Sequence, residues 1–80
     1  MKARITVTLK HGVLDPQGRA IANALHSLGF AGVEDVRQGK LIEVQLKAAS
    51  EAEARSELDA MCRQLLANTV IENYRVEFVA

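Results

Sequence analysis

The segment from His11 to Arg19 joins a strand pattern to a helix pattern, and it constrains the fold more than any other stretch. Before it, polar and apolar residues alternate from Lys2 to Lys10, which is typical of a half-buried strand. Within it, Asp15 suits the N-cap of a helix, and Pro16 suits the first helical position. The sequence therefore predicts a strand followed at once by a helix, which begins at Pro16 and stops at Gly29.

Two amphipathic helices are expected. In the first, apolar residues at helical spacing predict a buried stripe of Ile21, Ala24, Leu25 and Leu28. The second helix begins after Ser50, which forms a capping box with Glu53, and it runs toward Asn68. Its predicted apolar stripe comprises Ala54, Leu58, Met61, Cys62, Leu65 and Leu66.

Three further strands are predicted, at Val33–Arg37, Lys40–Lys47 and Ile71–Val79. Gln38 and Gly39 are predicted to form a tight turn between the first two, in which Gly39 is free to take a positive φ. The order β-α-β-β-α-β is the split-βαβ, or ferredoxin-like, arrangement. We therefore expect an α+β two-layer sandwich, in which a four-stranded antiparallel sheet carries both helices on one face.

The small size of the chain limits its stability. Its 80 residues form one domain (residues 1–80), and such a chain buries only about 60% of the surface that it exposes when unfolded. The single cysteine excludes an internal disulfide, and no Cys/His cluster has the spacing of zinc ligands. Partners are the remaining source of stability, so we expect a homodimer or a higher homo-oligomer.

The charge balance is neutral, with ten basic and ten acidic residues, which argues against nucleic acid or an anionic membrane as the main partner. RNA-binding domains of this topology carry aromatic residues on the exposed face of the central strands. Here those positions hold Thr6, Thr8, Glu43 and Gln45. Because the chain has neither a signal-peptide pattern nor about 20 consecutive apolar residues, we expect a cytoplasmic protein.

Three features invite a chemical interpretation, and each has a structural explanation that we favour. Asp15 and His11 resemble an acid/base pair, but helix capping explains Asp15. The loop from Gly12 to Gly18 resembles a phosphate loop, but its spacing fits no phosphate-binding motif and Asp15 would repel an anion. Cys62 lies on an apolar stripe, which predicts a buried and unreactive thiol. We therefore predict no catalytic, cofactor-binding or metal-binding residue in this chain.

Helix formation alone does not explain every residue at the start of the first helix. Gly18 lies just inside this helix, where most other residues would stabilise it better. We interpret Gln17, Gly18 and Arg19, together with His11 in the preceding loop, as residues that contact a partner chain.

Several motifs resemble one family along nearly the whole chain. They are Gly12-Val13-Leu14-Asp15-Pro16-Gln17-Gly18, Gly39-Lys40, Met61-Cys62-Arg63-Gln64-Leu65-Leu66-Ala67-Asn68 and Val70-Ile71-Glu72-Asn73-Tyr74. On these motifs the chain resembles the PurS family, the small subunits of phosphoribosylformylglycinamidine (FGAM) synthase. One position departs from the family pattern, since Thr69 stands where the family often has proline.

The resemblance implies a non-catalytic subunit of a ligase complex that binds ATP and belongs to de novo purine (IMP) biosynthesis. In that family a synthetase subunit, PurL, and a glutaminase subunit, PurQ, perform the chemistry with ATP, magnesium and glutamine. It implies that this chain is not an enzyme by itself, holds no cofactor, and bridges the two subunits as a homodimer that assists ammonia transfer. The residues alone leave one alternative open, a small dimeric regulatory domain of ferredoxin-like topology that binds a ligand at the loop from Gly12 to Gly18.

Overall fold

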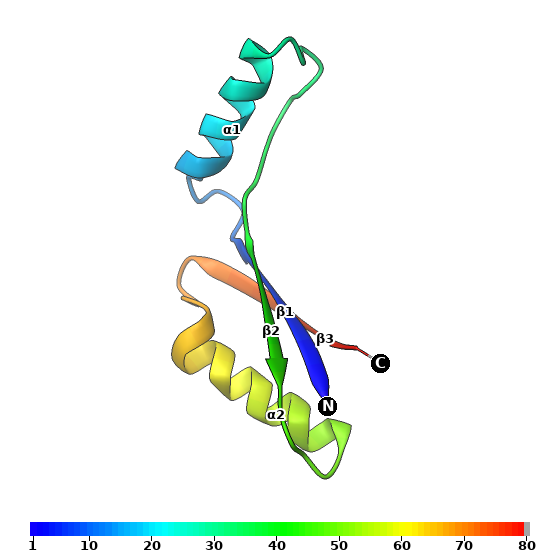
Figure 1. Ribbon diagram of the computed structural model, residues 1–80. Coiled ribbons are helices and arrows are strands. Elements are labelled where there is room, and N and C mark those ends of the chain that lie inside the picture. Colours follow the sequence, from blue (N-terminus) through cyan, green and yellow to red (C-terminus); the bar gives the residue numbers. More distant parts are fainter. Residues whose placement is uncertain (80) are drawn as a thin grey trace.

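The computed structural model describes residues 1–79 and shows an α+β chain built on an antiparallel sheet. Its elements are, in order, β1 (Lys2–Leu9), α1 (Pro16–Ser27), β2 (Lys40–Gln45), α2 (Glu51–Met61), the π-helical turn η1 (Cys62–Leu66) and β3 (Glu72–Val79). Within residues 1–79 the sheet has three strands in the order β2-β1-β3, and α2 covers one of its faces (Figure 1). The α+β class is therefore confirmed.

The core lies between the central strand β1 and helix α2. Ala3, Ile5 and Val7 point from β1 toward α2 and are completely buried. The alternation of the strand predicted this face through Ile5, Val7 and Leu9, of which Leu9 is only partly buried. Ile5 stands opposite Ile42 on β2 and Val76 on β3, so one apolar row crosses the sheet. The side chains that meet this row from α2 and η1 are also completely buried, and they are Ala54, Leu58 and Cys62.

Helix α2 begins as its capping residues predict and ends in a wider turn. The Ser50 hydroxyl accepts the Glu53 N–H at 3.1 Å, and the Glu53 carboxylate accepts the Ala49 N–H at 3.2 Å. After Met61 the backbone forms a π turn, which holds more residues per turn than an α-helix and rotates the side chains that follow. The predicted burial of Leu65 is wrong for this reason, since Leu65 is 83% exposed.

Helix α1 stands apart from the sheet, which contradicts the prediction that both helices cover one face (Figure 1). It starts at Pro16, and Gly29 follows its C-cap at a φ of 100°, as predicted. Its predicted buried stripe is nevertheless exposed, with Ile21 at 39% and Leu28 at 73%. Ala24 is exposed as well, and only Leu25 is partly covered.

The cause is the path of the chain from residue 33 to residue 40. The segment predicted as a strand, Val33–Arg37, is extended but belongs to no strand of the sheet that residues 1–79 form. Gln38 and Gly39 do not reverse the chain, which continues straight into β2 (Figure 1). Gly39 also does not take the positive φ that such a turn allows, since the positive values within residues 1–79 fall on Gly12 and Gly29. A Cβ at Gly39 would lie 2.5 Å from the Val7 carbonyl oxygen, so the glycine serves a close approach of two backbones.

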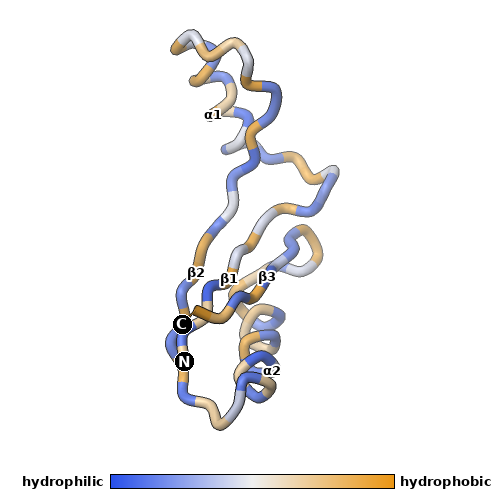
Figure 2. Tube along the Cα trace, turned by 90° about the vertical axis from the view of Figure 1, so that its right-hand side faces the viewer, coloured by the Kyte–Doolittle hydropathy of each residue, from blue (hydrophilic) through white to orange (hydrophobic). Residues whose placement is uncertain are grey.

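The single chain is consequently elongated. Its principal extents are 51, 28 and 14 Å, and its radius of gyration is 16.0 Å. A compact domain of this length would have a radius of about 12 Å. Figure 2 shows the same separation from the side, with α1 and its connecting loop at one end and α2 with the sheet at the other. The predicted sandwich is therefore only partly assembled within one chain.

Candidate functional site

The junction between β1 and α1 is organised by Asp15. One carboxylate oxygen accepts the Gly18 N–H at 2.9 Å, which is the predicted helix cap. The other oxygen accepts the Gln38 N–H at 2.7 Å, across 23 positions of sequence. Asp15 is 8% exposed, and the hydrogen bonds from Gln38 and then Gly18 lower its pKa. Asp15 therefore fastens the start of α1 to the chain that returns toward β2.

Gly18 lets α1 approach that returning chain closely. A Cβ at this position would lie 2.7 Å from Asp15 Oδ2 and closer still to the carbonyl oxygen of Val36. Gly18 is buried against its own chain for this reason, whereas the other predicted contact residues, His11, Gln17 and Arg19, are exposed. The structure thus explains the glycine by internal packing, which its sequence position alone did not reveal.

The four predicted contact residues do not converge on one pocket. Gln17 lines an open cavity of about 310 Å³, together with Asp15, Gln38, Lys40 and other residues at the end of the sheet. Arg19 lines a different and wider cavity of about 520 Å³ on the side of α1 that faces residues 34–37. His11 lies exposed in the turn before α1. They form a discontinuous surface around the junction rather than one site.

Two further contacts hold α1 and the returning chain together. His26 Nε2 lies 2.7 Å from the Val33 carbonyl oxygen, near the C-terminal end of α1. The Arg37 guanidinium donates to the Lys10 carbonyl oxygen at 3.2 Å, where β1 ends. We call residues 16–37 the α1 arm, because these contacts and those of Asp15 and Gly18 make α1 and the returning chain one unit.

The structure favours the capping explanation of Asp15 over acid/base chemistry. Both of its oxygens accept backbone N–H groups, and its lowered pKa keeps it ionised rather than ready to exchange a proton. Cys62 is buried as predicted, and burial raises the pKa of its thiol, followed by the charge of Asp59. Among residues 1–79, no group of three or more His, Cys, Asp or Glu side chains could hold a metal ion.

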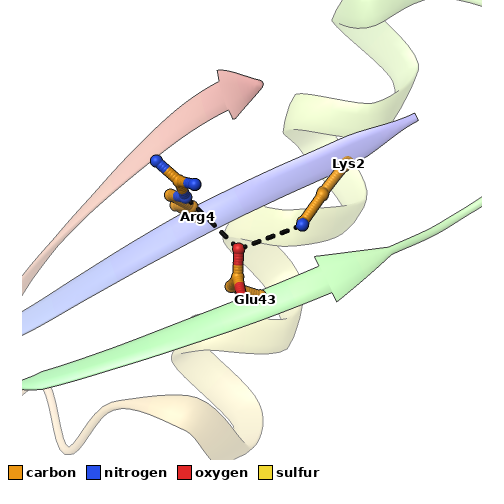
Figure 3. A network of polar contacts seen from close by, with 3 residues as sticks. All are labelled: Lys2, Arg4 and Glu43. Carbon is orange, nitrogen blue, oxygen red and sulfur yellow. Dashed lines mark hydrogen bonds and ion pairs between the residues drawn. The ribbon is translucent and has the colours of Figure 1, made fainter. Parts of the chain in front are cut away.

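The sheet face opposite α2 carries ion pairs. The Glu43 carboxylate on β2 forms two ion pairs with β1 (Figure 3). Its Oε2 atom lies 3.2 Å from Lys2 Nζ and 3.3 Å from Arg4 Nε. The hydrogen bond from Lys2 and then that from Arg4 lower the pKa of Glu43. All three side chains are about half exposed, so these pairs add little stability. This face is charged and open to solvent, as the alternation of the strands predicted.

A polar network that the sequence did not predict joins α2 to β3. The Tyr74 hydroxyl on β3 donates to the Asp59 carboxylate on α2. Arg63 lies 3.2 Å from the same carboxylate, one helical turn farther on. Tyr74 therefore fixes the tilt of α2 on the sheet, and the hydrogen bond to Asp59 raises the pKa of Tyr74.

Comparisons with known proteins agree with the motifs of the sequence. The family model described as "PurS: Phosphoribosylformylglycinamidine (FGAM) synthase" matches residues 2–80. The phosphoribosylformylglycinamidine synthase subunit PurS of Synechocystis is 57% identical over 77 residues, which cover 96% of this chain and 77% of that protein. No helix within residues 1–79 is long and apolar enough to cross a membrane.

Solved structures agree in fold as well. The crystal structure of PurS from Methanocaldococcus jannaschii has a TM-score of 0.87 at 41% identity, covering 95% of this chain and 92% of that one. A chain in the structure of PurLQS from Thermotoga maritima also has a TM-score of 0.87, at 32% identity, covering 95% and 93%. The matches cover nearly the whole of this chain, and they place it in the PurS family of FGAM synthase subunits.

Proposed function

We propose that this chain is the small, non-catalytic subunit of FGAM synthase in de novo purine biosynthesis. It bridges the glutaminase subunit, PurQ, and the ATP-dependent synthetase subunit, PurL, and assists the transfer of ammonia between them. The observation that carries the proposal is the end-to-end similarity to a chain in the PurLQS structure, which has the same fold over 93% of that chain.

Ammonia transfer explains why such a complex needs a subunit without chemistry of its own. Ammonia released into neutral water is diluted and protonated, and the ammonium ion has no lone pair with which to attack a substrate. A chain that holds glutaminase and synthetase together keeps the released ammonia close to its acceptor. ATP, magnesium and glutamine would then be bound by the partner subunits in the cytoplasm, and this chain would hold no cofactor.

The exposed residues around the α1 junction support a docking role for this end of the molecule. His11, Gln17 and Arg19 are the side chains that we propose to contact a partner subunit. Gly18 would act indirectly, since it is buried and sets the position of α1 against the returning chain. The four-stranded split-βαβ sandwich belongs to the same proposal, because a single chain supplies only three paired strands within residues 1–79.

Reconstitution tests the bridging role. Purified PurL and PurQ should convert formylglycinamide ribonucleotide with glutamine only when this chain is added, whereas high ammonium should support PurL without it. Arg19→Ala should raise the concentration of this chain that gives half-maximal glutamine-dependent activity. The matched control is Lys47→Ala, an exposed cation outside the junction, which should leave that concentration unchanged. Full glutamine-dependent activity without this chain would refute the proposal.

A further inference from the structure

The α1 arm contains a groove between one face of α1 and the returning chain, which runs alongside the helix (Figure 1). Two contacts within the arm limit this groove. Gly18 lies close to Val36 near the start of α1, and His26 contacts Val33 near its end. Between these contacts lie about 12 Å of helix axis, where the cavity of about 520 Å³ separates the two segments. We call this cavity the arm groove, and contacts within the chain hold its two sides in place.

The arm groove combines an apolar floor with charged walls. Val13, Ala22 and Val36 line it and are partly buried, so they supply the floor. This combination is typical of a site for a small molecule, because an apolar surface holds the body of a ligand and a few polar groups orient it. The exposed polar side chains of the walls are Arg19, Asn23 and His26 on α1, and Glu34, Asp35 and Arg37 on the returning chain.

The charges on the two walls do not neutralise one another. The ion pairs within residues 1–79 join other side chains, and none of them involves Arg19, Glu34 or Asp35. Arg37 is already occupied, since its guanidinium donates to the Lys10 carbonyl oxygen. Arg19 is therefore a cation without an ion-pair partner on the α1 wall, and Glu34 and Asp35 are anions without such partners on the opposite wall.

We propose that the arm groove binds a free α-amino acid with a short aliphatic side chain. The carboxylate of the amino acid accepts hydrogen bonds from Arg19, its ammonium group donates to Glu34 or Asp35, and its side chain lies on the apolar floor. A zwitterion suits the groove because it pairs both walls at once, whereas an anion would meet the two carboxylates and a cation would meet Arg19. The proposal concerns the chain by itself and holds whether or not it bridges PurL and PurQ.

Titration of the purified full chain with L-valine tests the site, with the backbone amide signals followed by NMR. The signals of Arg19, Asn23 and residues 34–36 should shift together and saturate, with a Kd of about 1 mM for so small a ligand. Isobutylamine lacks the carboxylate and isovalerate lacks the ammonium group. Each should bind at least about tenfold more weakly than valine, because one wall stays without its partner. Absence of saturation by about 10 mM valine, or equal binding of the three compounds, would overturn the proposal.

Variants that remove charge assign the two walls. Arg19→Gln, and separately Glu34→Gln combined with Asp35→Asn, should each weaken valine binding at least about tenfold. Their circular dichroism should stay native, because all three side chains are exposed. The matched controls, Lys47→Gln and Glu57→Gln, remove exposed charges outside the groove and should bind valine as the wild type does. Unchanged binding in either groove variant would place valine elsewhere and overturn the proposal. This assay contains neither PurL nor PurQ, so its failure is distinguishable from failure of the bridging role.

Discussion

Replacing Gly18 with alanine tests the close packing of the α1 arm most directly. The added methyl group would lie 2.7 Å from Asp15 Oδ2 and closer to the Val36 carbonyl oxygen, so the helix and the returning chain must separate. Overpacking costs about 1–3 kcal/mol in general. We take the upper part of this range, about 2–3 kcal/mol, because the nearest atom is a backbone carbonyl oxygen that cannot rotate away. Alanine returns about 0.8–1 kcal/mol through its higher helix propensity. We therefore expect a net loss of about 1–2 kcal/mol and a fall in Tm of roughly 5–15 °C.

The assay is thermal unfolding followed by circular dichroism at one fixed chain concentration, because association would otherwise shift Tm. Hydrogen exchange of the Gln38 N–H should accelerate as well, since this group donates to Asp15 across the packed surface. Gly32→Ala is the matched control, because Gly32 has a negative φ and no atom within 4 Å of its Cβ position. That variant should be neutral or slightly more stable. If Gly18→Ala unfolds at the same temperature as Gly32→Ala, the close approach of α1 and the returning chain does not hold in solution.

The remaining predictions concern three side chains. The pKa of Asp15 is lowered in the folded chain, so the stability that its carboxylate contributes is complete above about pH 4 and is lost as pH falls through the lowered pKa. In urea unfolding, the free energy of unfolding of Asp15→Ala should therefore fall less on acidification than that of the wild type. Tyr74→Phe removes the donor to Asp59 and should cost about 1 kcal/mol in the same assay, with native circular dichroism. The Cys62 thiol is buried with a raised pKa, so a maleimide should modify it far more slowly in the folded chain than in urea, and equal rates would show that the core opens there.

Local signals in the sequence predicted the elements well. Asp15 and Pro16 set the start of α1, and Ser50 sets the start of α2, because capping depends on residues within one turn. The alternation along β1 predicted that Ile5, Val7 and Leu9 share the core face, and Ile5 and Val7 are completely buried while Leu9 is partly buried. Each of these predictions rests on residues that are close together in the sequence, and in these places the packing of the folded chain agrees with them.

Predictions that depended on the path of the chain were wrong. Gly39 was assigned to a tight turn, but glycine is equally required where two backbones come close, and the sequence does not distinguish these uses. Leu65 is exposed because of the π turn, and no pattern of residues in the sequence predicted that turn. The second hydrogen bond of Asp15 joins positions 15 and 38, and so depends on where the returning chain passes. Burial of Gly18 against Val36 follows from the same long-range path.

The apolar stripe of α1 shows the common cause of these wrong predictions, which is the path of the chain. Its helical periodicity predicts that Ile21, Ala24 and Leu28 meet an apolar surface, but periodicity does not say which chain supplies that surface. Closing the arm on its own sheet and closing it on a second copy would satisfy the same pattern with the same residues. What decides between them is the short segment at Gln38 and Gly39, where one arrangement needs a reversal and the other needs an extended chain. Asp15 and Arg37 hold this segment extended, so the junction between β1 and α1 keeps the α1 arm away from the sheet of its own chain.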